Sequence, residues 1–320
     1  MATFSNAPQN PHTNSISSIF NPGFIVDGLI PNLEITSADA VHFHVHRDRL
    51  FLASTNAFGG LLRDPVFSFA VPEPATVLNI VLNVIYGMSC LPNPPSLEST
   101  EAALDALIKY GLPVAQLAKP SYPLYELIRS YAPYYPIEAY AVAGHYKLEE
   151  LAVAISAHLL AFDLSRISDE LTVKMGPIYF SRLANLHRAR MTALRNIVLQ
   201  PPAMHPITPT CNEEVQRELS RAWAFANAEI VWNALPSKSP RPLPLLHMCQ
   251  RRTELMPMMA AFATDISTYA LESAFTHAAA SIKCPDCQMM LRTRIKEVIY
   301  QWSAVKLVHC MATIPLKTTI

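Results

Sequence analysis

Residues Val41 to Leu62, VHFHVHRDRLFLASTNAFGGLL, change from an alternating pattern to a helical one within a few positions. Val41, Phe43 and Val45 alternate with histidines, which predicts a strand with one apolar face and one imidazole face. After Asp48, apolar residues recur at helical spacings as far as Leu62. We therefore expect a short strand that leads directly into an amphipathic helix, and this junction decides the fold of the N-terminal part.

The histidines of this strand allow two interpretations. An H-x-H pair places His42 and His44 on one side of the strand, as in some zinc enzymes, so a zinc-dependent hydrolase is one alternative. A catalytic zinc would also need a third ligand from outside the strand and an open coordination position. In the other interpretation, His42 and His44 form a half-exposed strand face, and His46 holds backbone groups at the junction.

The overall composition is that of a well-buried chain rather than a disordered one. Of the 320 residues, 51% are hydrophobic and only 16% are charged. The 25 basic and 25 acidic residues give a formal net charge of zero, which argues against direct binding of nucleic acid or an anionic membrane. The length allows two domains, or one domain with a large extension.

Residue usage also excludes several classes of protein. The chain has 8 glycines against 27 prolines, and neither a G-x-x-x-x-G-K nor a G-x-G-x-x-G phosphate loop occurs. Six thinly spread cysteines and no recognisable signal peptide lead us to expect reduced thiols, in the cytoplasm or the nucleus. The longest mainly apolar segment, Val77 to Met88, is too short to span a bilayer.

The pattern along the chain changes from mixed to purely helical. Residues 1–22 are rich in Asn, Ser and Pro, which predicts a disordered tail. Leu33 to Ile35 should form a hairpin with the histidine strand, and Phe67 to Val71 a third strand. Beyond residue 133 every strong periodic segment is helical, and the predicted helices include Glu213–Trp232, Thr253–Ala280 and Thr293–Val308. The fold class is therefore α+β and mostly helical.

The order Phe43-x-Val45-His46-Arg47-x-x-Leu50-x-x-x-Ser54-x-x-Phe58 resembles the start of a BTB/POZ domain, in a form found in many fungal proteins. The strand end VPEP and the apolar helix after it extend the resemblance. It implies a small sheet flanked by helices over residues 23–133, followed by an all-α extension over residues 134–320. The resemblance and the apolar pattern together predict these residues in or beside the BTB core: Phe43, Val45, His46, Arg47, Leu50, Leu52, Ser54 and Phe58.

One position departs from the BTB pattern. Many BTB domains carry an aspartate at the start of the first strand, paired with the basic residue after the histidine. Here Asn32 stands opposite Arg47, so that ion pair is absent. The peptide-binding pocket of transcription-factor BTB domains is therefore not expected.

The resemblance implies a protein–protein interaction module rather than an enzyme. It implies self-association through the BTB domain or an adaptor role, including that of a substrate adaptor for a cullin-type ubiquitin ligase. Residues Pro136 to Phe162 also resemble the paired helices that follow the BTB domain in adaptor proteins. The alternative is a transcriptional or chromatin regulator that acts through partners, since no zinc-finger or helix-turn-helix spacing occurs.

The sequence Cys284-Pro-Asp-Cys287 is a candidate for structural zinc. A C-x-x-C pair can bind one zinc ion through both thiolates, but a structural site needs four ligands. His205 and Cys211 are the best-spaced residues to complete it, and the four together would hold the C-terminal helices. The alternatives are a reduced surface pair at a helix start and a redox motif, which the lack of a thioredoxin-like βαβ pattern disfavours.

Overall fold

A computed structural model describes residues 15–233, 266–280 and 282–311. The chain divides into two compact units. The first unit comprises the residues up to 135 together with 146–151. The second unit comprises 136–145 and the residues from 152 onward.

The first unit contains a four-stranded sheet in the order β1-β3-β2-β4. The predicted hairpin is confirmed: β2 (Leu33–Thr36) pairs antiparallel with β3 (Val41–Val45), and Leu33 lies opposite Val45. The third predicted strand is present as β4 (Ser68–Ala70), which pairs parallel with β2. Burial alternates along β2, and Phe43 and Val45 of β3 are buried, so one sheet face belongs to the core.

The remaining strand of the sheet, β1 (Ser15–Ile16), lies within residues 1–22, which were predicted to be a disordered tail. It pairs parallel with β3, and Phe20, a few residues later, is completely buried. The prediction is wrong for residues 15–22, because main-chain hydrogen bonds and a single aromatic anchor order a segment whose composition is polar. Residues 1–14 lie outside the described part of the chain.

The helix after β3 is shorter than its apolar spacing predicts, since α1 spans Arg47–Ala53 and the chain then turns. The Ser54 hydroxyl donates to the Tyr110 carbonyl at 2.6 Å and accepts the Phe58 amide at 2.7 Å. These bonds hold a turn in which Phe58 adopts a φ of 55°. Leu52 lies inside α1, two positions after the buried Leu50 and so on the opposite side of the helix. The prediction that Leu52 is a core residue is therefore wrong: it is 83% exposed.

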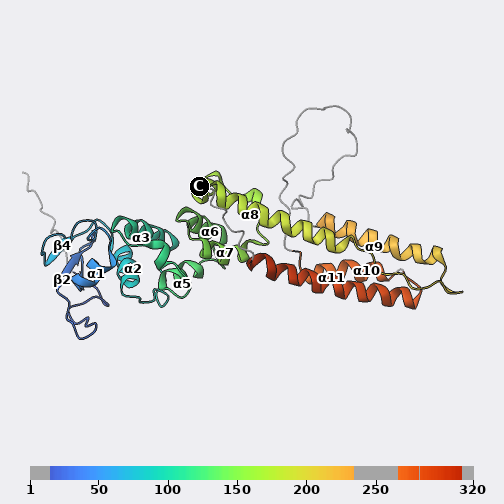
Figure 1. The fold of residues 1–320 in the computed structure, drawn as a ribbon, viewed down its shortest axis with the longest axis horizontal. Coiled ribbons are helices and arrows are strands. Elements are labelled where there is room, and N and C mark those ends of the chain that lie inside the picture. The colour runs from blue at the N-terminus through green and yellow to red at the C-terminus, as the bar shows by residue number, and fades with distance from the viewer. Residues whose placement is uncertain (1–14, 234–265, 281, 312–320) are drawn as a thin grey trace, which may run out of the picture. The chain divides into compact units, whose positions relative to one another are not determined.

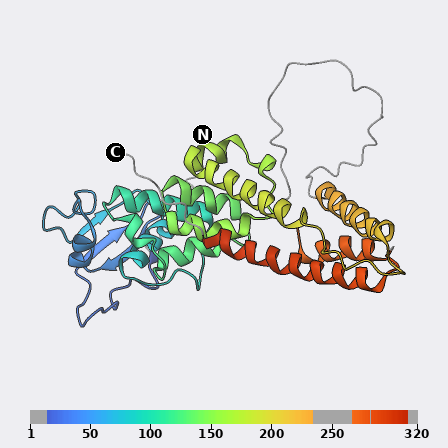
Figure 2. The same ribbon diagram turned by 45° about the vertical axis from the view of Figure 1, so that its right-hand side comes forward.

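Four helices complete the first unit: α2 (Ala75–Ile85), α3 (Leu97–Lys109), α4 (Val114–Leu117) and α5 (Pro123–Ser130). Helix α2 is the central one, because it packs against α1, α3 and α5. Figure 2 shows the strands of this unit in blue to cyan and its helices α2 to α5 in cyan to green. Buried aliphatic side chains dominate α2, as its continuous apolar sequence predicts.

All the secondary-structure elements named in the described residues of the second unit are helices. It begins with α6 (Pro136–His145), the second half of α7 (Glu149–Ser156) and two 3₁₀ turns, η1 (Ala157–Leu159) and η2 (Leu164–Arg166). The long helices are α8 (Asp169–Val198), α9 (Glu213–Asn233), α10 (Thr268–Ala279) and α11 (Pro285–Met311). Ser168 caps α8, and Gly176 kinks it directly before Pro177.

The long helices of this unit pack along one another (Figure 1). Helix α10 packs against α9 and α11, and α11 packs against α8. Trp223 of α9 stacks on Phe275 of α10 with ring centroids 4.2 Å apart. No helix in the described ranges is both long enough and apolar enough to cross a membrane.

Two predicted helix boundaries differ from the structure. Helix α10 begins at Thr268, and the earlier part of the predicted helix, residues 253–265, lies outside the described residues. Helix α11 begins at Pro285 rather than Thr293, because proline is well suited to the first position of a helix. The CPDC sequence therefore lies on the first turn of α11.

Candidate functional site

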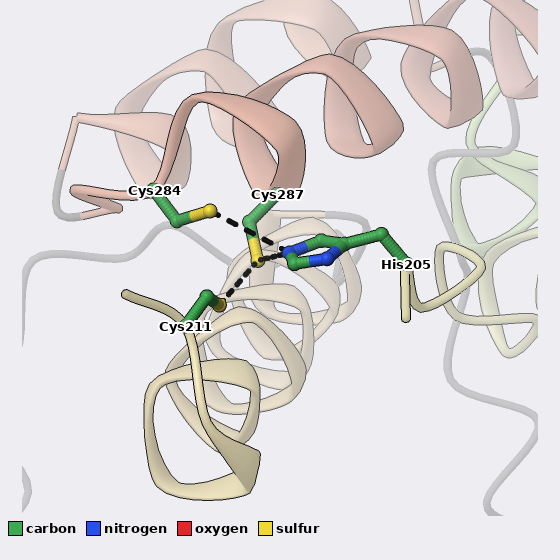
Figure 3. A group of neighbouring side chains, drawn as sticks. All are labelled: His205, Cys211, Cys284 and Cys287. Atoms are coloured by element: carbon green, nitrogen blue, oxygen red, sulfur yellow. Dashed lines mark hydrogen bonds between the residues drawn. The ribbon is translucent and has the colours of Figure 1, made fainter. Parts of the chain in front are cut away.

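The structure brings together the four residues that the sequence proposes as metal ligands. One ligand atom each from His205, Cys211, Cys284 and Cys287 lies within 4.8 Å of every other. Figure 3 shows the imidazole and the three sulfur atoms pointing toward one another. In the part of the chain that the structure describes, this is the only such group of three or more His, Cys, Asp or Glu side chains.

Two segments supply these residues. Cys284 directly precedes α11 and Cys287 lies in its first turn, so a single helix start presents both thiols. His205 and Cys211 lie in the connector between α8 and α9. Cys211 is fixed there by a turn in which its amide and carbonyl bond to the carbonyl and amide of Thr208, each at 3.1 Å.

The distances within the cluster are short. The Cys211 and Cys287 sulfur atoms are 3.7 Å apart. The His205 Nε2 atom lies 3.2 Å from the Cys287 sulfur and 3.5 Å from the Cys284 sulfur. Cys211 and Cys287 are fully buried, whereas His205 and Cys284 are partly exposed. All three cysteines are free, so no disulfide competes for them in this arrangement.

The orientation of His205 is set by backbone contacts. Its Nδ1 atom is 2.7 Å from the Pro206 carbonyl, which can only accept, so Nδ1 carries the proton. The lone pair of Nε2 then faces the sulfur atoms. Gln216, a buried side chain of α9, donates to the His205 carbonyl at 2.7 Å. These two contacts hold a ring that presents Nε2 as the ligand atom.

The thiols differ in acidity because their surroundings differ. The Cys287 amide donates to the Cys284 sulfur, and this contact, with others in the cluster, lowers the pKa of the Cys284 thiol to about 7. Burial raises the pKa of Cys287 to about 12 and also raises the pKa of Cys211. The hydrogen bond to Pro206 raises the pKa of His205. One thiol of the three is therefore predisposed to ionise.

Arg294 fixes the segment that leads to the cluster. It lies on α11 and is 7% exposed. Its guanidinium donates to the Ile197 carbonyl at 2.8 Å and to the Gln200 carbonyl at 3.2 Å, so it caps the carboxyl end of α8. The connector between α8 and α9 therefore begins at a segment that Arg294 holds against α11, the helix that also carries Cys287.

The residues predicted in or beside the BTB core differ in burial: Arg47 and Ser54 are partly exposed, Leu52 is exposed, and the others are buried. Phe58 stacks on Tyr110 with ring centroids 4.1 Å apart. The Arg47 guanidinium donates to the carbonyls of Leu62 and Asp64, and the amide of Arg47 donates to the side chain of Asn32. Four of these predicted residues have side chains that are at most 2% exposed: Phe43, Val45, Leu50 and Phe58.

His46 holds backbone groups at the strand–helix junction, as one of the two interpretations predicts. It is 4% exposed, and its Nε2 donates to the Leu29 carbonyl at 3.0 Å. The Tyr86 hydroxyl lies 2.9 Å from Nδ1 and accepts the His46 amide at 2.8 Å. Every polar atom of the ring is thus satisfied, which is the ordinary condition for a buried histidine.

The arrangement of His42 and His44 gives no support to a catalytic zinc. The Nδ1 atom of His42 lies 2.8 Å from a carboxylate oxygen of Glu34, and the Thr36 hydroxyl is 3.4 Å from the same nitrogen. Among the described residues no third ligand joins the two histidines within metal-binding distance. The pair is instead part of a half-exposed strand face.

Sequence reasoning missed Gln216 and Arg294, which support the cluster without belonging to a motif. It also missed five exposed apolar side chains, two on α1 and three on the loop before β2. Their exposed fractions are 60% for Ile25, 63% for Leu29, 70% for Ile30, 47% for Phe51 and 83% for Leu52. The one available signal was the run Leu50-Phe51-Leu52, which has too many adjacent apolar residues for one buried helix face.

Comparison of the chain with protein-family models, with curated proteins and with solved structures found no match.

Proposed function

We propose that the chain is a protein–protein interaction module of the BTB type. The observation that carries this proposal is the topology of the first unit. The β2–β3 hairpin leads through α1 to β4, which pairs parallel with β2. The four helices α2 to α5 follow. This small sheet with flanking helices coincides with the residues in which the sequence resembles a BTB domain.

The exposed apolar side chains of this unit support an interaction role. We call Ile25, Leu29, Ile30, Phe51 and Leu52 the α1 apolar surface. Arg49 of α1 forms an ion pair with Asp27 and so holds the loop against the helix. His46 fixes the same loop through the Leu29 carbonyl. Large apolar groups held on an ordered surface favour burial against another protein.

The proposed partner of this surface is a second copy of the chain. Self-association would remove the exposed apolar groups of both copies from water through one self-complementary patch. An adaptor role, in which the module recruits a cullin-type ubiquitin ligase, is a further step of the same proposal. A transcriptional regulator that acts through protein partners is the alternative.

Light scattering of the full-length protein tests self-association. We expect a dimer mass at tens of micromolar for the wild type, and a monomer mass for Leu52→Asp, because a carboxylate on this surface would be desolvated on pairing. The control is Val173→Asp, which changes an 81% exposed side chain of the second unit and should leave the dimer intact. A strictly monomeric wild type would contradict self-association.

Affinity purification followed by mass spectrometry tests the adaptor role. A cullin recovered with the wild type and lost with a variant of the α1 apolar surface would support it. Recovery of DNA-bound regulators without a cullin would instead favour the alternative. The two outcomes distinguish the roles because the same bait is used in both.

A further inference from the structure

We propose that His205, Cys211, Cys284 and Cys287 bind one zinc ion in a structural site of the second unit. This inference goes beyond the interaction role and does not depend on it. Three cysteine sulfurs and one imidazole nitrogen form a donor set typical of structural zinc. Thiolates also select against Mg²⁺ and Ca²⁺, which prefer oxygen ligands.

Three of the six distances between the ligand atoms match tetrahedral zinc. With a Zn–S bond of about 2.3 Å and a Zn–N bond of about 2.0 Å, tetrahedral angles place two sulfurs about 3.8 Å apart and a sulfur and a nitrogen about 3.5 Å apart. The sulfurs of Cys211 and Cys287 are 3.7 Å apart. The nitrogen of His205 is 3.2 Å and 3.5 Å from the sulfurs of Cys287 and Cys284.

A disulfide explains this arrangement less well. A disulfide bond needs sulfurs about 2.05 Å apart, far below the 3.7 Å that separates Cys211 from Cys287. It would also leave one of the three cysteines unpaired and give the imidazole no role. A metal ion uses all four side chains at once, including the Nε2 lone pair that the Pro206 contact turns toward the sulfurs.

The proposed site is closed, which makes it structural rather than catalytic. Four protein ligands occupy every position of a tetrahedral ion and leave none for water or substrate. On binding, the three thiols lose three protons, so that Zn²⁺, three thiolates and a neutral imidazole carry a net charge of −1. The amides of Asp286 and Cys287 donate to the Cys284 sulfur at the amino end of α11, where negative charge is favoured.

The zinc ion would join two segments that are far apart in the sequence. The paired contacts link residues separated by 76 to 82 positions. They connect the start of α11 with the connector between α8 and α9. Gln216 is a positioning residue in this scheme, since it reaches the zinc ligand only through the His205 carbonyl.

Metal analysis of the full-length protein, purified without chelator, is the first test. We expect one zinc ion per chain in the wild type, and less than a tenth of that content in Cys211→Ser and Cys287→Ser. Cys90→Ser is the matched control, because Cys90 is also buried but lies in the first unit, outside the cluster. Zinc content that survives both cluster substitutions would place the ion elsewhere and overturn the proposal.

A second measurement covers the case in which the cysteine variants do not fold. Zinc is removed from the wild type with a chelator and replaced by Co²⁺, whose thiolate complexes absorb strongly in the near ultraviolet. We expect this absorption together with hydrogen-exchange protection of α11, and loss of that protection in the metal-free protein while the first unit stays protected. Absence of zinc in the wild type, or absence of the cobalt–thiolate absorption, would overturn the proposal.

Discussion

The two units of this chain are held together in different ways. The first unit surrounds a small sheet with buried aliphatic and aromatic side chains, and its buried histidine is satisfied by neighbouring groups. The second unit consists of long helices whose ends are fixed by side chains that reach distant carbonyls. Arg294 and Trp302 are examples, and Trp302 donates to the Ile266 carbonyl at 2.8 Å. The first unit should therefore respond most to loss of apolar volume. The second unit also has a buried apolar core, so it should respond both to loss of apolar volume and to loss of these polar contacts.

Truncation of Phe58 should have the largest effect on the first unit. The ring is completely buried and stacks on Tyr110. We expect Phe58→Ala to lower the free energy of unfolding of that unit by about 3–5 kcal/mol, because the cavity adds to the lost transfer energy. Urea unfolding followed by far-ultraviolet circular dichroism measures it.

Leu52→Ala is the control for this truncation. It also removes apolar atoms from the same region, but Leu52 is 83% exposed. We expect a change within about 0.5 kcal/mol. Equal losses for the two variants would contradict the placement of Phe58 as a core residue and Leu52 as a surface residue.

Acid should weaken the second unit through His187. Burial, together with a smaller effect of the nearby Arg190, lowers the pKa of His187 to about 4. The unfolded chain binds this proton below its ordinary pKa of about 6.5, whereas the folded chain does not, so stability is complete above that pH and falls as the pH drops toward 4. The expected loss is on the order of 2–3 kcal/mol.

The variant His187→Gln separates this effect from other titrations. It removes the ionisable group, so we expect the loss of stability between pH 7 and pH 4 to be smaller than in the wild type by about the same amount. Thermal unfolding of both proteins over this range measures the difference. Parallel pH profiles would show that His187 does not titrate as its burial implies.

A methyl group at Gly144 should have a smaller effect on the same unit. An added Cβ would lie 2.8 Å from the Met175 carbonyl oxygen and 3.1 Å from the Tyr179 ring, where α6 meets α8. We expect Gly144→Ala to cost about 1–2 kcal/mol, since the steric cost exceeds the gain of about 1 kcal/mol in helix propensity. Gly23→Ala, which would meet only the Asn21 side chain, is the control. A stabilised Gly144→Ala protein would show that α6 and α8 pack less closely.

The elements that the sequence predicts well are those with a clear period. The alternation around Phe43 and the helical spacing in residues 213–232 correspond to β3 and α9. The end of α1 could not be read in this way, because the turn depends on the Ser54 contact with Tyr110, 56 positions away. The formation of strand β1 likewise depends on pairing with β3 rather than on the composition of residues 15–16.

The candidate site also has parts that a local sequence pattern predicts and parts that depend on distant contacts. The spacing of Cys284 and Cys287 identifies one half of a metal site, since both thiols lie on one helix start. The other half was predicted from the spacing of His205 and Cys211, and the structure brings these two residues to the pair. Gln216 could not be found, because one glutamine in a helix carries no pattern until its carbonyl partner is known.

The contact between Cys211 and Cys287 also affects how the chain tolerates changes of length. The two residues close a loop that contains α9 and α10. The entropy of loop closure rises only with the logarithm of loop length, so doubling such a loop costs about 0.6 kcal/mol. Insertions between α9 and α10 should therefore change the free energy of folding little, as long as the loop ends meet. One residue inserted between Cys284 and Cys287, in contrast, would move one ligand around the start of α11. Related chains should accordingly vary in length between α9 and α10 and keep the spacing of the cysteine pair.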